Sequence, residues 1–187
     1  MPDGTLATII VGFVIILVIF VIPAGNAKRR RRLQERFGSE YDRVVGERQS
    51  RRRAEAELAA RERRVRKLRL RDLTGDARDK YGVQWTKVQV RFVDDPSGAI
   101  ADAQALVETV MRERGYPVSG YQQTVADLSV AHARMLDHFR AAHQVSVSAA
   151  AGKVATEEIR IALLHYREMF SELLGEGLTG DDHVAAA

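Results

Sequence analysis

The chain has 187 residues with a formal net charge of +4, and it contains no cysteine, which excludes disulfides and thiolate metal sites and fits a reducing compartment. The charge is unevenly distributed: residues 28–71 hold 18 Lys and Arg against 7 Asp and Glu (+11), whereas residues 72–187 hold 11 against 17 (−6). We therefore expect a basic segment followed by an acidic domain. The chain is long enough for one domain with a real core.

An uncharged apolar run occupies Leu6–Ile22. As a helix it would span about 26 Å, close to the ~30 Å hydrocarbon core of a bilayer, so residues 1–27 are predicted to be an N-terminal tail and a transmembrane anchor. A cleaved secretory signal is the alternative, because residues 25–27 (Gly-Asn-Ala) resemble a weak cleavage site. The anchor is favoured, since the N-terminal tail carries Asp3 and no cation, and the run is longer than a signal core.

Five consecutive cations follow the apolar run: Lys28, Arg29, Arg30, Arg31 and Arg32. Cations beside a single span are retained on the cytoplasmic side, so the pattern predicts an N-terminus outside the cell membrane and a cytoplasmic C-terminal domain. The same residues are the candidate membrane-surface site, where each cation near anionic lipid headgroups contributes on the order of 1 kcal/mol. The alternative is that they only fix the topology.

Residues 28–71 are expected to form a basic, Arg/Glu-rich helical stalk in two pieces. The first piece carries a narrow apolar stripe, made of Leu33, Phe37, Tyr41, Val44 and Val45. Two glycines in the same piece weaken its helix preference. In the second piece Glu and Arg recur four residues apart, and a heptad frame places Arg51 and Arg61 at seam positions. These features favour a solvated or lipid-facing helix over a coiled-coil dimer.

Residues 72–178 are expected to form an all-α bundle of four to five helices, and residues 179–187 to be disordered. Thr74 is a candidate N-cap for a first helix that ends near Val93. Apolar side chains recur at spacings of three and four along it: Tyr81, Trp85, Val88 and Phe92. This stripe predicts that Trp85, the only tryptophan, is buried in the core.

The second helix of the domain has a clear start and a clear end. Asp95 is a candidate N-cap because Pro96 suits the first helical position, and Gly115 followed by proline two residues later is a typical stop. A third helix is expected over 120–128 and a fourth over 131–147.

The end of the domain is predicted from its glycines and its acidic residues. The Ala-, Ser- and Gly-rich segment 146–152 predicts fraying and a loop. Thr156 is then a candidate N-cap for a last helix that ends at Gly175.

Three segments, in this order behind a single span, carry a resemblance: FGSEYDR at 37–43, RFVDDP at 91–96 and MRERGYP at 111–117. They are similar to those of a family of uncharacterised actinobacterial single-span, membrane-anchored proteins, often labelled secreted or membrane proteins. The resemblance covers nearly the whole chain after the anchor. It implies the same architecture and brings no activity with it.

The residue types that carry chemistry are not arranged in a recognisable pattern. His132, His138 and His143 are separated by six and five residues, which does not place them on one helical face, and His165 belongs to another predicted helix. Asp94-Asp95 is better explained by capping than by acid/base catalysis. We therefore expect no catalytic, cofactor or metal site, and no enzyme. Arg91, Phe92 and Arg114 are candidates for fixing loops or meeting a partner, with loop fixing favoured.

The sequence thus indicates a single-pass membrane protein that presents an acidic helical domain to an unknown cytoplasmic protein partner, as a non-enzymatic interaction or adaptor module. The main alternative is a nucleic-acid or regulatory binder that uses the Arg-rich stalk. Nucleic acid is not favoured, because Glu is interleaved with Arg and no aromatic ladder is present. A secreted helical protein, released by signal cleavage, is the other alternative.

Overall fold

A computed structural model describes Phe13 and residues 27–175 of the chain. These residues form helices, turns and loops without any strand, so the all-α class is confirmed for them. In the part of the chain that the structure describes, no helix combines the length and the apolar character needed to cross a bilayer. The anchor predicted at Leu6–Ile22 lies outside the described residues apart from Phe13, as does the tail predicted at 179–187.

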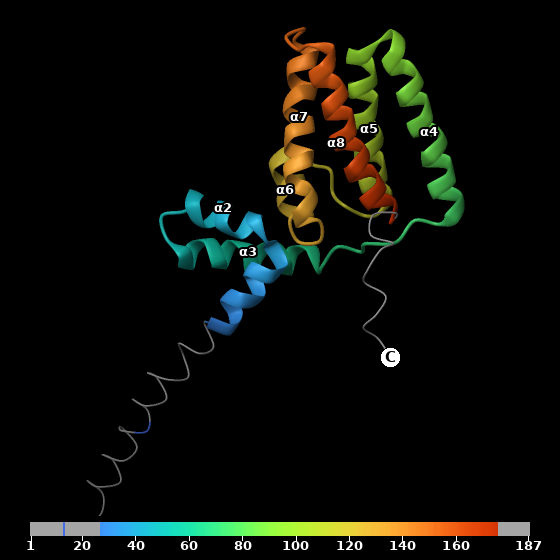
Figure 1. Ribbon diagram of the computed structural model, residues 1–187. Helices are drawn as coiled ribbons and strands as arrows, with labels where there is room; N and C mark the ends of the chain where they lie inside the picture. The colour runs from blue at the N-terminus through green and yellow to red at the C-terminus, as the bar shows by residue number, and fades with distance from the viewer. Residues whose placement is uncertain (1–12, 14–26, 176–187) are drawn as a thin grey trace, which may run out of the picture. The chain divides into compact units, whose positions relative to one another are not determined.

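The chain divides into two compact units between Ala60 and Arg61, inside the segment that the charge pattern marks as the stalk. The first unit contains a helix over 27–37, α2 (Ser39–Glu47) and most of α3 (Arg51–Val65). Gly38 has a φ of 50° and separates the first helix from α2. Figure 1 shows α2 and α3 lying side by side, joined by a short turn.

The first unit has buried apolar side chains, which corrects the expectation of a solvated or lipid-facing helix. At most 2% of the surface of each is exposed: Leu33, Phe37, Tyr41, Val44, Ala54 and Leu58. The Tyr41 hydroxyl donates a hydrogen bond of 2.9 Å to Glu55, and Arg48 pairs with Glu57 at 2.5 Å, so α2 and α3 are also held together by polar contacts. The apolar stripe read from the sequence therefore packs, although arginine surrounds it.

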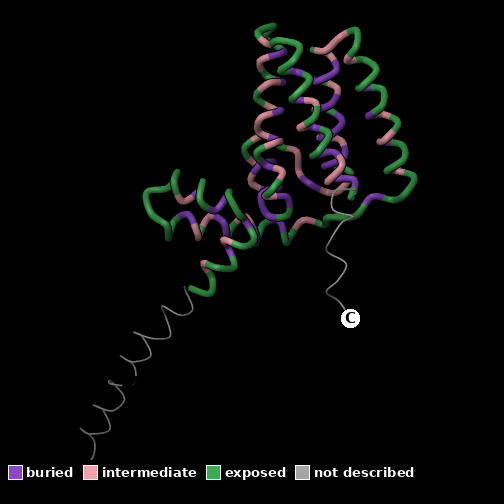
Figure 2. The backbone as a smooth tube through the Cα atoms, viewed as in Figure 1, coloured by how far each residue is buried: buried purple, intermediate pink, exposed green. Residues whose placement is uncertain are grey.

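The second unit is a helical bundle whose helices are α4 (Gly75–Asp94), α5 (Pro96–Glu113), α6 (Tyr121–Leu128), a 3₁₀ turn (Ala133–Met135), α7 (Leu136–Ala150) and α8 (Thr156–Leu174). Helix α5 packs against α4, α7 and α8, and α7 packs along α8. Figure 1 shows α4 at one edge of this group, and Figure 2 shows buried positions recurring along the helices of the bundle.

The core of the bundle is aliphatic and aromatic, and Trp85 belongs to it as the stripe on α4 predicts. Only 7% of the Trp85 side chain is exposed, and its ring stacks on Phe170 of α8 with the centroids 4.9 Å apart. Tyr166 of α8 is fully buried, and burial raises the pKa of its hydroxyl far above the usual value. These contacts join the edge helix α4 to the centre of the bundle.

The helix ends of α4 and α5 are formed by the residues that the sequence indicates. The Thr74 hydroxyl accepts a hydrogen bond of 3.3 Å from the Ala77 amide, and the Asp95 carboxylate accepts one of 2.8 Å from the Gly98 amide. Gly115 and Gly175 have φ values of 91° and 81°, the left-handed conformation that ends helices.

Three boundaries predicted from the sequence are wrong. Thr156 is the first residue of α8 rather than its cap, and Glu158 reaches back to accept a hydrogen bond of 3.0 Å from the Ala155 amide. Helix α7 begins at Leu136 and continues to Ala150, through the segment predicted to fray. Ser146 and Ala149 are buried, and alanine is the strongest helix former, so packing and the intrinsic preference of Ala149 and Ala150 both favour the extension.

Candidate functional site

The predicted membrane-surface residues lie on the first two turns of the helix over 27–37. Lys28, Arg29, Arg31 and Arg32 are exposed, and Arg30 is partly buried. Successive residues on a helix point about 100° apart, so five in a row surround the helix instead of forming one face. Arg30 lies on the side of the helix that also carries the buried Leu33 and Phe37, and the four exposed cations occupy the rest of the circumference.

The RFVDDP segment forms a charged corner between α4 and α5. Arg91 donates to Asp95 at 2.7 Å and 3.2 Å and to Asp102 at 2.6 Å. The Gly98 amide and then Arg91 lower the pKa of the Asp95 carboxyl, and hydrogen bonds to Asp102 and Asp95 raise the pKa of Arg91. All these groups face solvent, and their role is to fix the corner, which confirms loop fixing for Arg91.

The MRERGYP segment also has a structural role, at the other end of α5. A Cβ atom on Gly115 would lie 2.6 Å from the Arg69 carbonyl oxygen, so only glycine allows this close approach. The Arg71 amide donates to the Arg114 carbonyl at 3.1 Å, and the Arg114 side chain donates to the Leu173 carbonyl at 3.0 Å and pairs with Asp72 at 3.1 Å. Arg114 therefore also fixes a loop.

A buried carboxylate that the sequence does not reveal lies on α6. Asp127 is fully buried and accepts hydrogen bonds from Arg64 at 3.0 Å and from Gln123 at 3.1 Å. Burial raises the pKa of Asp127, while Arg64 and Arg61 oppose that shift. The pair ties the end of α3 to α6 within the second unit, and no spacing rule connects residues 63 positions apart.

The histidines are separated into three environments. His132 is buried, with its Nδ1 atom 3.0 Å from Glu172, and burial lowers its pKa despite that carboxylate. His143 stacks on Tyr121, with the ring centroids 4.0 Å apart. His138 of α7 and His165 of α8 meet, with their Nδ1 atoms 2.8 Å apart. Among the described residues no group of three or more His, Asp or Glu could hold a metal ion.

The outer face of α4 carries an apolar stripe on the side away from the core. Val83, Val90 and Val93 are 60%, 66% and 81% exposed. The spacing of seven and three places them along one face of the helix, with Thr86 between them. An edge helix that buries one stripe and exposes a second has an apolar surface available for another helix.

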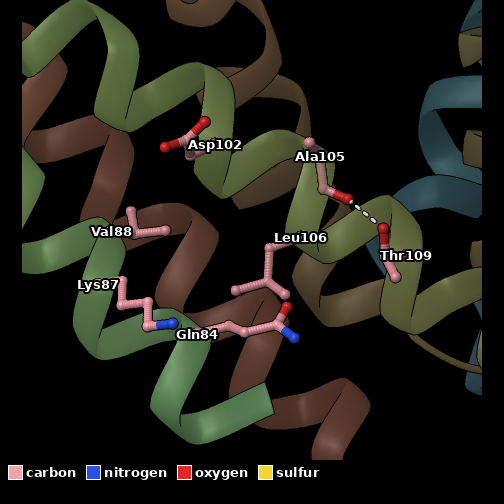
Figure 3. Close-up of a pocket in the computed structure, with 7 residues that line it drawn as sticks. All are labelled: Gln84, Lys87, Val88, Asp102, Ala105, Leu106 and Thr109. Atoms are coloured by element: carbon pink, nitrogen blue, oxygen red, sulfur yellow. Dashed lines mark hydrogen bonds between the residues drawn. The ribbon is translucent and has the colours of Figure 1, made fainter. Parts of the chain in front are cut away.

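A shallow groove of about 310 Å³ lies between α4 and α5 (Figure 3), and its lining residues Gln84 and Lys87 directly follow Val83 and Thr86 along α4. Gln84 and Lys87 extend from α4 and Asp102 and Thr109 from α5, on either side of the space. The other lining residues are Val88, Ala105 and Leu106. The groove is open and has a partly apolar lining with opposite charges on its two sides. It is therefore shaped to receive a side chain rather than to enclose a small molecule.

The valines on α4 and the adjoining groove are the features that the helical periodicity suggested least, because the inward stripe of α4 dominates its pattern. A signal does exist: Val83, Thr86, Val90 and Val93 follow one another at spacings of three, four and three.

No family model, no curated protein and no solved structure matches this chain.

Proposed function

We propose that this protein is a non-enzymatic interaction module, held in the cell membrane by a span over residues 6–22, whose helical domain binds a helix of a partner protein on the cytoplasmic side. The uncharged run and the five cations behind it support the anchor and its orientation.

The observation that carries the interaction role is the exposed valine stripe of α4. Recognition of a helix by a helical surface uses apolar anchors three, four and seven residues apart, and Val83, Val90 and Val93 are separated by seven and three residues. Lys87 is exposed between the stripe and the groove. The partner segment is therefore an amphipathic helix with an apolar stripe and with an Asp or Glu placed to meet Lys87.

Nucleic-acid binding through the stalk is less well supported than protein binding. Arg43 pairs with Glu40 at 2.8 Å and with Glu47 at 2.5 Å, and Arg48 pairs with Glu57 at 2.5 Å. Ion pairs inside the segment compete with phosphate for the same guanidinium groups. The folded first unit also presents fewer cations along one line than an extended basic helix would.

The interaction role is tested by purifying the tagged full-length chain from its own membranes in mild detergent. The test variant is Val83→Asn/Val90→Asn/Val93→Asn. The matched control, Val147→Asn/Ile161→Asn/Leu164→Asn, changes the same number of exposed apolar side chains on other helices. We expect at least one protein to be retained by the wild-type chain and the control and to fall about tenfold or more with the α4 variant.

Equal recovery of every associated protein by the three chains would contradict a docking role for α4. A second copy of the chain with a different tag, expressed together with the first, distinguishes the possible partners. If that copy is the protein lost with the α4 variant, the partner is a second copy of this chain.

A further inference from the structure

His138 and His165 come from different helices, and their rings meet edge to edge. The Nδ1 atoms are 2.8 Å apart, and the ring centroids are 4.8 Å apart with the planes tilted by 50°. Both side chains are only partly buried, so water reaches the edge of the pair. Helices α7 and α8 pack along each other, which fixes the two backbones that carry these rings (Figure 1).

This separation is close to the one that a shared metal ion requires. With metal–nitrogen bonds of about 2.0–2.1 Å and angles between square and tetrahedral, two imidazole nitrogens on one ion lie about 2.9–3.4 Å apart. The observed Nδ1 atoms therefore need to separate by only a few tenths of an ångström. That is within the reach of small χ rotations.

We propose that His138 and His165 form a binding site for a borderline transition-metal dication, Zn²⁺, Ni²⁺ or Cu²⁺, in which the two Nδ1 atoms are ligands and water completes the coordination. Imidazole is a preferred ligand for these ions, and Cu²⁺ binds most tightly in the usual order of affinities. Glu168 lies one turn beyond His165 on α8 and adds negative charge near the ion.

The protons can be accounted for at the pair. In the metal-free state one Nδ1–H donates to the other Nδ1, so one lone pair is already available and one is blocked by a proton. On metal binding the donor imidazole loses its Nδ1 proton to water and takes one at Nε2, which leaves both rings neutral and both Nδ1 lone pairs on the ion. Burial and the neighbouring His138 lower the pKa of His165, which favours the neutral form of the imidazole.

The site explains why sequence spacing on α7 alone indicates no metal. His132, His138 and His143 diverge around that helix, and the second ligand comes from α8 instead. Because the ion would join α7 to α8, it would stabilise the folded bundle. At a metal concentration about 100 times the Kd, the ratio of folded to unfolded chain rises about 100-fold.

The test titrates ZnCl₂, NiCl₂ and CuCl₂ separately into the untagged full-length chain in detergent at pH 7.5, by calorimetry and by thermal unfolding. We expect saturable one-to-one binding and a higher melting temperature for at least one of the three ions. The variants His138→Gln and His165→Gln should each weaken binding at least tenfold. The control His183→Gln, a residue outside the described part of the chain, should leave binding unchanged.

Binding that is unaffected by both His138→Gln and His165→Gln, or no binding of any of the three ions below 1 mM (about −4 kcal/mol), would overturn the proposal. If either variant fails to fold, the wild-type chain provides the answer by NMR. Substoichiometric Cu²⁺ should broaden the imidazole signals of His138 and His165 before those of His132 and His143. The reverse order would equally overturn it.

Discussion

Replacing Trp85 with alanine should lower the free energy of unfolding by about 3–4 kcal/mol. A buried aromatic ring covers about 150–250 Å², worth about 4–6 kcal/mol at 25 cal/mol per Å² as an upper bound, and truncations of this kind usually cost about 3–5 kcal/mol. The stack on Phe170 at 4.9 Å is lost as well. We expect the lower part of the range because α4 is at the edge of the bundle and can partly close the cavity.

The matched variant Trp85→Phe separates the ring from its polar atom. The indole Nε1 atom is buried without a hydrogen-bond partner in the described structure, a condition that costs about 1–3 kcal/mol. Phenylalanine keeps a ring against Phe170 and removes that unpaired donor, while its smaller size leaves some space. These effects oppose each other, so the stability of Trp85→Phe should lie within about 1 kcal/mol of the wild type.

The assay is urea unfolding of the full-length chain in detergent, followed by circular dichroism at 222 nm. Trp85 is the only tryptophan in the chain, so the wild-type emission spectrum reports on this site alone. The reasoning fails if Trp85→Ala leaves the urea midpoint unchanged while the native emission maximum equals that of the unfolded chain. It also fails if Trp85→Phe is as damaging as Trp85→Ala.

Three further predictions use other parts of the molecule. Gly98→Ala should lower the urea midpoint because its Cβ would lie 2.0 Å from the Asp95 carboxylate, which would have to move away and weaken its cap hydrogen bond with the Gly98 amide. Gly82→Ala, with open space around it, should raise stability by about 0.5–1 kcal/mol, and equal shifts would contradict this. Burial lowers the pKa of His132, His143 and His165 in the folded chain below the usual 6.5. In mild acid the unfolded chain therefore binds more protons than the folded chain does. The stability that these neutral rings contribute above pH 6.5 should accordingly be lost as the pH falls. Melting temperatures at pH 7.5 and 5.5 check the sign, and a chain that is more stable at pH 5.5 would refute it. A reporter fused after Ala187 should be cytoplasmic and resist protease added to intact cells, and recovery of a processed soluble form from the medium would refute the anchor.

The sequence predicts those parts of the fold that depend on local chemistry. Thr74 and Asp95 cap their helices as expected, because a short polar side chain before a helix satisfies the same amide groups wherever it occurs. Gly115 is recognisable for a similar reason, since its positive φ excludes most other residues. The burial of Trp85 could be predicted because apolar residues recur at helical spacing on its side of α4.

The parts that depend on contacts between distant residues could not be predicted. The Arg64–Asp127 pair and the His138–His165 pair join residues 63 and 27 positions apart, and one sequence gives no measure of such distances. The extension of α7 to Ala150 is different, because Ala149 and Ala150 are strong helix formers and only the burial of Ser146 and Ala149 could not be read from the sequence. The outward stripe on α4 was not predicted because the inward apolar residues dominate the periodicity of that helix.

The central claim, that the outer face of α4 binds a partner helix at the membrane, is tested most directly by photo-cross-linking in intact cells. A photoreactive residue is placed at Val90, and at the exposed Ile161 of α8 as the control. We expect a cross-linked product of one discrete mass from position 90, which stays with the membranes when they are washed. We expect no product of the same mass from position 161. The same adducts from both positions, or none from position 90, would contradict it.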